Sequence, residues 1–96
     1  MEAFRYGFIT GGHQRHLLFE RLADALYSAL CDVPEPQTTP LGIRQGARIY
    51  HRHSELVALA ERHQALLAAR DHRPLIQALE AEAAARLQSE TVSDSR

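Results

Sequence analysis

The sequence predicts a small, mainly all-α protein in which three helices follow a short extended N-terminal arm. Alanine and leucine dominate a chain of 96 residues without tryptophan, and both are good helix formers. Apolar residues recur at helical spacing over most of the chain. Three of the four prolines gather in one stretch, which we expect to separate the first helix from the second.

Composition indicates a single soluble domain. The chain is 45% hydrophobic and 24% charged, which is ordinary for a globular protein with a modest core. Cys31 is the single cysteine, so an internal disulfide is excluded and a reducing compartment is expected. No segment approaches the roughly 18 apolar residues that span a bilayer. We therefore expect a cytoplasmic protein with no membrane partner.

Residues 1–12 are expected to form an extended arm. Phe4, Tyr6 and Phe8 alternate with other residue types, which is the period of a strand. A single strand cannot form a sheet. The arm must therefore lie over a helix, pair with its counterpart in a second chain, or add to a partner's sheet edge.

The remaining domain, residues 13–88, is expected to be helical. The first helix is expected at about 13–32, followed by a proline-rich linker over 33–41 and by a frayed polar tail over 89–96. Apolar side chains gather on one face of the first helix, but Leu17, Tyr27 and Cys31 project from the opposite face. This helix is therefore predicted to contact apolar neighbours on two sides.

Helices two and three are expected at about 40–70 and 72–88. An apolar stripe with nearly heptad spacing marks the second half of helix two and indicates a seam between helices. It comprises Leu56, Leu59, Ala60, His63, Leu66, Leu67 and Arg70. Whether helix two continues through Gly46 and through residues 51–53 stays open at this stage.

A second copy of the chain is expected to complete this fold. Helix two would be roughly 45 Å long at 1.5 Å per residue, which exceeds the diameter of a compact domain of this size. A homodimer would cover its excess length, the second face of helix one and the solitary strand, although a higher oligomer stays open. The residues predicted for self-association or partner binding are Phe4, Tyr6, Phe8, Leu17, Tyr27, Leu56, Leu59, His63, Leu66 and Leu67.

The histidines do not predict a metal site, and no cofactor is expected. Zinc needs three or four converging ligands, whereas His51 and His53 would point about 200° apart on a helix. His63 lies within the apolar stripe and is interpreted as a buried neutral histidine with a hydrogen-bond partner. A pH-responsive contact at His63 is the alternative.

Arg44, Arg48 and Arg52 are predicted to form a charged contact edge on helix two. Residues 41–54 contain no acidic residue, so this edge suits an acidic protein surface. Three arginines on a chain with a formal net charge of −1 fall short of the basic face of most DNA-binding proteins. Nucleic acid is therefore an unlikely partner.

The functional prediction is a small regulatory or adaptor protein that acts by binding another protein. Masking of a transcription regulator, as an anti-activator does, is one role that fits this size and architecture. The alternatives are a histidine-based module that senses a metal or ligand and, less favoured, a helical dimer that binds nucleic acid. No nucleophile or acid–base pair stands in a recognisable setting, so an enzyme is not predicted.

Overall fold

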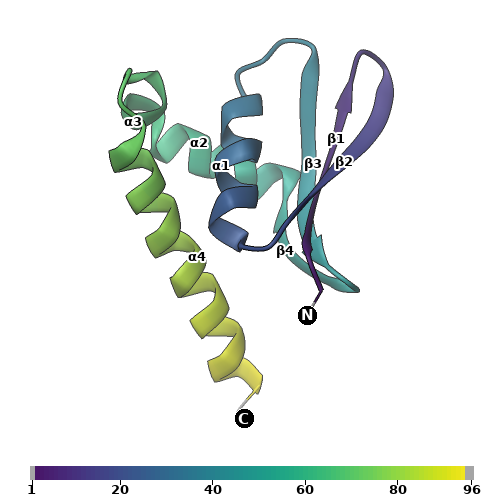
Figure 1. Ribbon diagram of the computed structural model, residues 1–96, viewed down its shortest axis with the longest axis vertical. Helices are drawn as coiled ribbons and strands as arrows, with labels where there is room; N and C mark the ends of the chain where they lie inside the picture. Colours follow the sequence, from purple (N-terminus) through teal and green to yellow (C-terminus); the bar gives the residue numbers. More distant parts are fainter. Residues whose placement is uncertain (1, 95–96) are drawn as a thin grey trace.

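Four antiparallel strands form one sheet, and the helices lie on one side of it (Figure 1). The computed structural model describes the backbone of residues 2–94 and the side chains of residues 2–88. The order of strands across the sheet is β2-β1-β3-β4. The strands are β1 (Phe4–Thr10), β2 (His13–Phe19), β3 (Thr38–Gln45) and β4 (Arg48–Arg52). The helices are α1 (Leu22–Asp32), α2 (His53–Arg62), α3 (Gln64–Ala68) and α4 (Arg73–Asp94).

The prediction of a mainly all-α, three-helix domain is wrong, because parts of both the first and the second expected helix form strands of a four-stranded antiparallel sheet. The extended arm is β1, which lies between β2 and β3 and pairs with both. The expected first helix is divided into β2 and α1. The expected long second helix is divided into β3, β4, α2 and α3.

A tight hairpin joins β1 to β2. Thr10 and His13 are paired across the turn, and Gly11 and Gly12 between them have φ values of 56° and 80°. Two successive positive φ angles match the two-residue turn whose twist suits a hairpin, and glycine adopts these angles without a Cβ clash. This pair therefore reverses the chain direction between the two strands.

The second hairpin replaces the first half of the expected long helix. Its turn lies at Gly46 and Ala47, and α2 begins only at His53. The Glu55 carboxylate accepts a hydrogen bond from the Arg52 amide, at 3.1 Å, which satisfies a backbone donor at the start of this helix. The sequence left open whether helix two continues through Gly46 and through residues 51–53. The structure has no continuous helix at either place.

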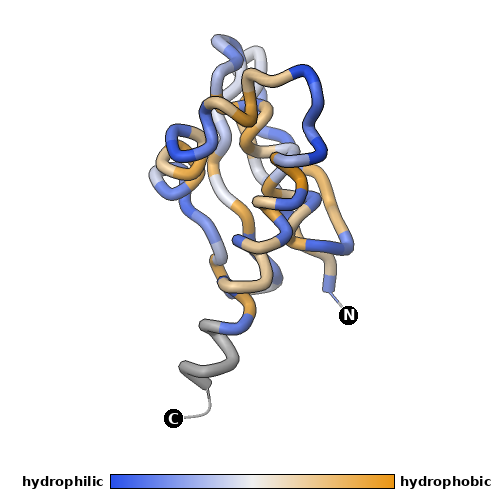
Figure 2. Tube along the Cα trace, turned by 90° about the vertical axis from the view of Figure 1, so that its left-hand side faces the viewer, coloured by the Kyte–Doolittle hydropathy of each residue, from blue (hydrophilic) through white to orange (hydrophobic). Residues whose placement is uncertain are grey.

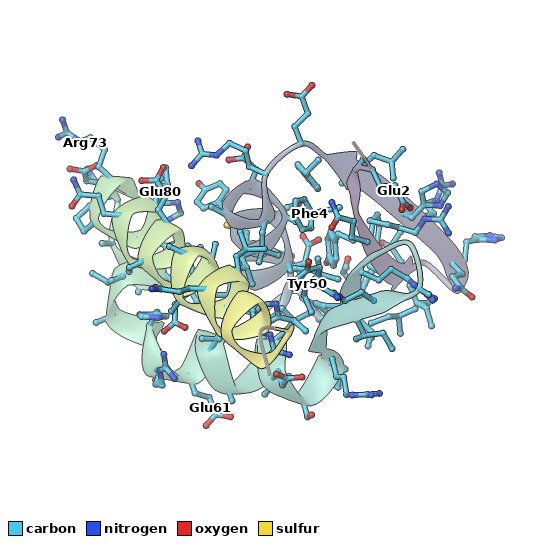
Figure 3. All side chains as sticks on the ribbon, turned by 90° about the horizontal axis from the view of Figure 1, so that it is seen from below. Glu2, Phe4, Tyr50, Glu61, Arg73 and Glu80 are labelled. Carbon is cyan, nitrogen blue, oxygen red and sulfur yellow. The ribbon has the colours of Figure 1, made fainter. Side chains whose placement is uncertain are left out.

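The core lies between the sheet and α1, with α2 and α4 packed around that helix. The Phe4 and Tyr50 rings meet edge to face there, with centroids 5.5 Å apart (Figure 3). The Tyr6 side chain is fully buried, and its hydroxyl donates to Asp32 Oδ2 at 2.7 Å. Figure 2 shows strongly hydrophilic residues at several of the outer turns. Burial of these apolar side chains in one chain supplies the main driving force for folding.

The last helix begins close to the predicted residue. Leu75, Leu79 and Ala83 are buried against the rest of the fold, whereas Ile76 and Leu87 are exposed. The α4 backbone is helical through the expected polar tail as far as Asp94, and residues 95–96 lie outside the described part. Among residues 2–94, no helix combines the length and the hydropathy needed to cross a bilayer.

A single chain accounts for most of the three observations that predicted a dimer. The strand β1 has neighbours on both sides within its own sheet. The excess helix length disappears, because the chain turns at Gly46 and Ala47 and α2 begins only at His53. The Tyr27 hydroxyl donates to Nδ1 of His72 at 2.7 Å, on the same chain. Self-association stays a prediction, but it now needs a different physical basis.

Candidate functional site on the open face of the sheet

The two faces of the sheet have opposite character. On β1, Phe4, Tyr6 and Phe8 point towards the helices, so Arg5 and Gly7 point to the uncovered side. Because paired residues in an antiparallel sheet share a face, the strand register extends this assignment to the other strands. We call the uncovered side the open face.

One row of paired residues crosses the middle of the open face. It consists of His16, Gly7, Gly42 and Arg52, on β2, β1, β3 and β4 in turn. The two central members have no side chain, so the backbone itself forms the floor of a hollow. A Cβ added at Gly7 would meet no atom within 4 Å. A histidine and an arginine stand at the two ends of this floor.

The neighbouring row carries two arginines side by side. It consists of Leu18, Arg5, Arg44 and Ile49, in the same strand order. Arg5 and Arg44 are both exposed and lie directly opposite each other on β1 and β3. Like charges in this arrangement destabilise a sheet. The two arginines are flanked by exposed apolar side chains on the outer strands.

The hollow over these rows has a volume of about 490 Å³ and a strongly basic lining. Four arginines and two histidines line it, and no aspartate or glutamate does so. The arginines and histidines that line it are Arg5, Arg15, His16, Arg44, His51 and Arg52. Across the four strands the sequence has five arginines and no acidic residue. The carboxylates of the chain all lie outside the strands, so the net charge of −1 conceals a positive face.

The arginines of the open face are not neutralised within the fold. Among the described residues, Arg5 and Arg44 form no ion pair. The Arg44 side chain donates from Nε to the Gly46 carbonyl oxygen at 3.1 Å, which leaves its other guanidinium donors available. Glu2 lies at the rim, close to Gly46, and lines a neighbouring hollow with both arginines (Figure 3). The open face therefore offers guanidinium groups to an external anion.

A second, mixed-charge hollow of about 370 Å³ lies between α2 and α4. A bulge in β4 turns two successive residues, Tyr50 and His51, towards the helices. Burial lowers the pKa of His51 below its usual range, and the Arg86 guanidinium lowers it further. Glu55 and Glu82 act on His51 in the opposite direction. These positive and negative groups balance, so this hollow has no preference for an anion comparable to that of the open face.

The histidines do not assemble a metal centre. His63 is half-buried, and its Nε2 is 3.8 Å from Glu82 Oε1, while His53 Nδ1 is 2.6 Å from the Pro40 carbonyl oxygen. Within the described residues, no group of three histidine, cysteine or acidic side chains has the geometry to hold an ion. The histidine-based sensing alternative therefore has no preformed site to support it.

The predicted charged edge lies on strands rather than on a helix. Arg44 is on β3, and Arg48 and Arg52 are on β4, all three exposed. Arg44 and Arg52 line the hollow of the open face, whereas Arg48 pairs with Gln45 beside the hairpin turn. The sequence thus identified part of the basic surface while placing it on the wrong type of element.

Most residues predicted for self-association belong to the interior of one chain. Phe4, Tyr6, Leu56 and Leu59 are buried, and others are half-buried against the same core, namely Phe8, Tyr27, Leu66 and Leu67. His63 is half-buried beside α4. Leu17 differs from all of these, because it lies on β2 and is 45% exposed.

Sequence reasoning missed Arg5, Gly7 and His16 as site residues. The alternation in "FRYGF" already placed Arg5 and Gly7 opposite the aromatic side chains. Their grouping with Arg44 and Gly42 depends on the pairing of β1 with β3, which are separated by more than 25 residues and by a helix. Strand register over such a distance has no short-range signal.

Searches of protein-family models, of curated proteins and of solved structures find no match to this chain.

Proposed function

We propose that this protein is a small non-enzymatic adaptor or regulator whose open face binds an acidic segment of a protein partner. The observation that carries the proposal is the pair Arg5 and Arg44, which lie directly opposite each other and form no ion pair with any side chain of residues 2–88. A fold tolerates such repulsion at a cost, and an external carboxylate would convert the repulsion into attraction.

The chemistry of the open face suits carboxylates on an extended segment. Guanidinium groups form forked, bidentate hydrogen bonds with carboxylates. The floor at Gly7 lets a bound backbone approach the sheet closely, since a Cβ added there would meet no atom within 4 Å. Exposed Leu18 and Ile49 at the sides supply apolar contacts. A transcription regulator, the partner expected from the sequence, would fit if it presents such a segment.

A protein partner is favoured over nucleic acid by the placement of the aromatic side chains. Single-stranded nucleic acid binds most sheet surfaces by stacking its bases on exposed aromatic rings. Here Phe4, Tyr6, Phe8 and Tyr50 all point towards the helices, and no phenylalanine, tyrosine or tryptophan lines the hollow. The open face therefore offers positive charge without a phenyl, phenol or indole ring on which a base could stack.

Fluorescence anisotropy with a labelled peptide tests this proposal. The probe alternates glutamate with threonine over about ten residues, enough at about 3.3 Å per residue to cross the four strands. We expect saturable binding to the full chain, weakened about tenfold or more in Arg5→Gln and in Arg44→Gln. Hydrogen bonds to a charged group contribute about 1.5–3 kcal/mol each.

One control variant removes the same single positive charge as the test variants, and one control peptide removes the negative charges of the probe. Arg70 is exposed and follows α3 in the chain, and Figure 1 shows α3 on the side of the molecule away from the strands, so Arg70→Gln should bind the peptide like the parent chain. A glutamine–threonine peptide should not bind. Equal losses of peptide affinity in all three variants would show that net charge alone causes the effect, and would contradict the proposal. Tighter binding of a single-stranded or duplex oligonucleotide than of the acidic peptide would do so as well.

A further inference from the structure

The two edges of the sheet differ in how they are protected against pairing with another strand. The edge strand β4 has five residues, contains a bulge and leads directly into α2. The other edge strand, β2, has seven residues in uninterrupted register with β1. It contains no proline and no bulge, which are two of the usual devices that block an edge, and Arg15 is the one arginine it carries. Its outer backbone donors and acceptors have no partner strand in the sheet.

Exposed leucines accompany this unprotected edge. Leu17 is 45% exposed and Leu18 is 60% exposed, on the helix side and on the open face respectively. Leu18 is the most exposed of the large apolar residues described. Paired with a further strand, both side chains would gain a cross-strand neighbour, and their apolar surface would leave water.

We propose that β2 pairs with β2 of a second copy, antiparallel about a two-fold axis, with Leu17 facing Leu17. At the strand positions next to Leu17 on the helix side, this register sets Arg15 against Phe19 of the second copy. On the open face, it sets Leu18 against His16 of the second copy. No two arginines oppose each other within the paired strands.

The sequence of β2 distinguishes this register from its neighbour. Centring the pair on His16 would face two imidazoles and would leave neither leucine opposite another leucine. Centring it on Leu17 places two leucines face to face, and every pair from Arg15 to Phe19 then contains an apolar side chain. Self-complementarity of this kind is what an isologous interface requires.

Such a dimer would have one eight-stranded sheet, because each chain contributes four strands. A residue and its cross-strand partner lie on the same face, so the two open faces would point in the same direction. The basic hollows of the two copies would then lie side by side. A partner with two acidic segments could engage both, and its apparent affinity would rise through effective concentration.

Light scattering of the purified full chain gives the first test. We expect the mass of two chains at about 100 μM, and the mass of one chain for Leu17→Arg at the same concentration. Opposed guanidinium groups would raise the dissociation constant about tenfold or more. Because Leu17 is exposed, this variant should keep the far-UV circular dichroism of the parent. A parent chain that stays monomeric at this concentration would overturn the proposal.

Disulfide trapping tests the register itself. In a Cys31→Ser background, Leu17→Cys should form a cross-linked dimer under mild oxidation, because Cα atoms of facing residues are about 4.5–5.5 Å apart. Leu18→Cys should cross-link far more slowly, since residue 18 faces residue 16 of the second copy. Faster cross-linking at position 18, or equal rates at both positions, would show a different interface. Neither measurement involves the acidic partner, so this proposal and the proposed function can fail separately.

Discussion

Arginine side chains on the open face are expected to reduce the stability of the free protein. Arg5 and Arg44 repel each other across the paired strands β1 and β3. Arg5→Gln should therefore raise the free energy of unfolding by about 0.2–1 kcal/mol while it weakens binding of the acidic peptide. Urea denaturation measures the first effect, with Arg70→Gln as the control. A clear loss of stability in Arg5→Gln would mean that Arg5 supports the fold and that our interpretation of the pair is wrong.

The buried imidazole of His51 is expected to make stability depend on pH. Its pKa is lowered in the folded protein by burial and by Arg86, although Glu55 and Glu82 oppose this shift. Below the unfolded pKa of about 6.5, the unfolded chain therefore binds a proton that the folded chain does not. Stability should fall as pH drops through this range, by at most about 1.4 kcal/mol per pH unit for one proton.

Urea titrations between about pH 7.5 and 5 measure this dependence, since histidine in the unfolded chain titrates in this range and most carboxylates do not. The slope of stability against pH should be smaller in His51→Gln than in the parent. His13→Gln, at the exposed hairpin turn, should keep the parent slope. If the slope of stability against pH is unchanged in His51→Gln, a titratable group other than His51 causes the pH dependence.

The pairing of β3 with β4 depends on a close approach that only glycine permits. A Cβ at Gly42 would lie 2.7 Å from the His51 carbonyl oxygen, a backbone atom that cannot move alone. Gly42→Ala should therefore destabilise the fold by about 1–3 kcal/mol. Gly7, the residue paired with Gly42, has open space above it. Gly7→Ala should be neutral or should stabilise by about 0.4–1 kcal/mol. Thermal unfolding of the two variants measures both effects. Equal losses of stability in Gly42→Ala and Gly7→Ala would contradict the described register.

Local patterns predicted the strands and helices only in part. The alternation of Phe4, Tyr6 and Phe8 identified β1, and the apolar spacing of Leu75, Leu79 and Ala83 identified α4. The sequence did not predict β2 as a strand, because the apolar residues of β2 lie at its end next to α1. Leu18, Phe19 and Leu22 then extend the helical spacing backwards across the boundary between the two elements.

The missed hairpin between β3 and β4 has a similar cause. Ile43 and Tyr50 are buried in the core, but polar and charged residues surround them, and the β4 bulge breaks the alternation. The spacing of the apolar residues between 40 and 70 is therefore also compatible with an uninterrupted helix. The length of the expected helix already argued against continuity, because it exceeds the diameter of a compact domain of this size. The interruption at Gly46 resolves this conflict within one chain.

The candidate site shows the same division between local and long-range information. Arg44, Arg48 and Arg52 lie close together in the sequence, and the absence of nearby acids marked them as a charged edge. The role of Arg5 emerges only when β1 is placed next to β3. Contacts between distant strands are set by the whole fold, and no window of a few residues contains them.

The complete fold separates charge on a chain whose net charge is nearly zero. The strands supply arginines without carboxylates, whereas acidic residues such as Glu61 and Glu80 are carried by the helices (Figure 3). Arg21 and Glu80 form an ion pair at 2.6 Å, and Arg62 pairs with Glu82. Arg21 and Arg62 thus find partners on a helix of the same chain. Among the described side chains, the arginine pair at the centre of the open face does not, and this contrast is the basis of the proposed function.

Chemical-shift mapping by NMR tests that proposal most directly. The ¹⁵N-labelled chain is titrated with the glutamate–threonine peptide, and the shifts of its backbone amides are followed. We predict that the largest changes occur at Arg5, Gly7, Gly42 and Arg44, with little change along α4. Largest changes on the helices, or no change at saturating peptide, would contradict the account.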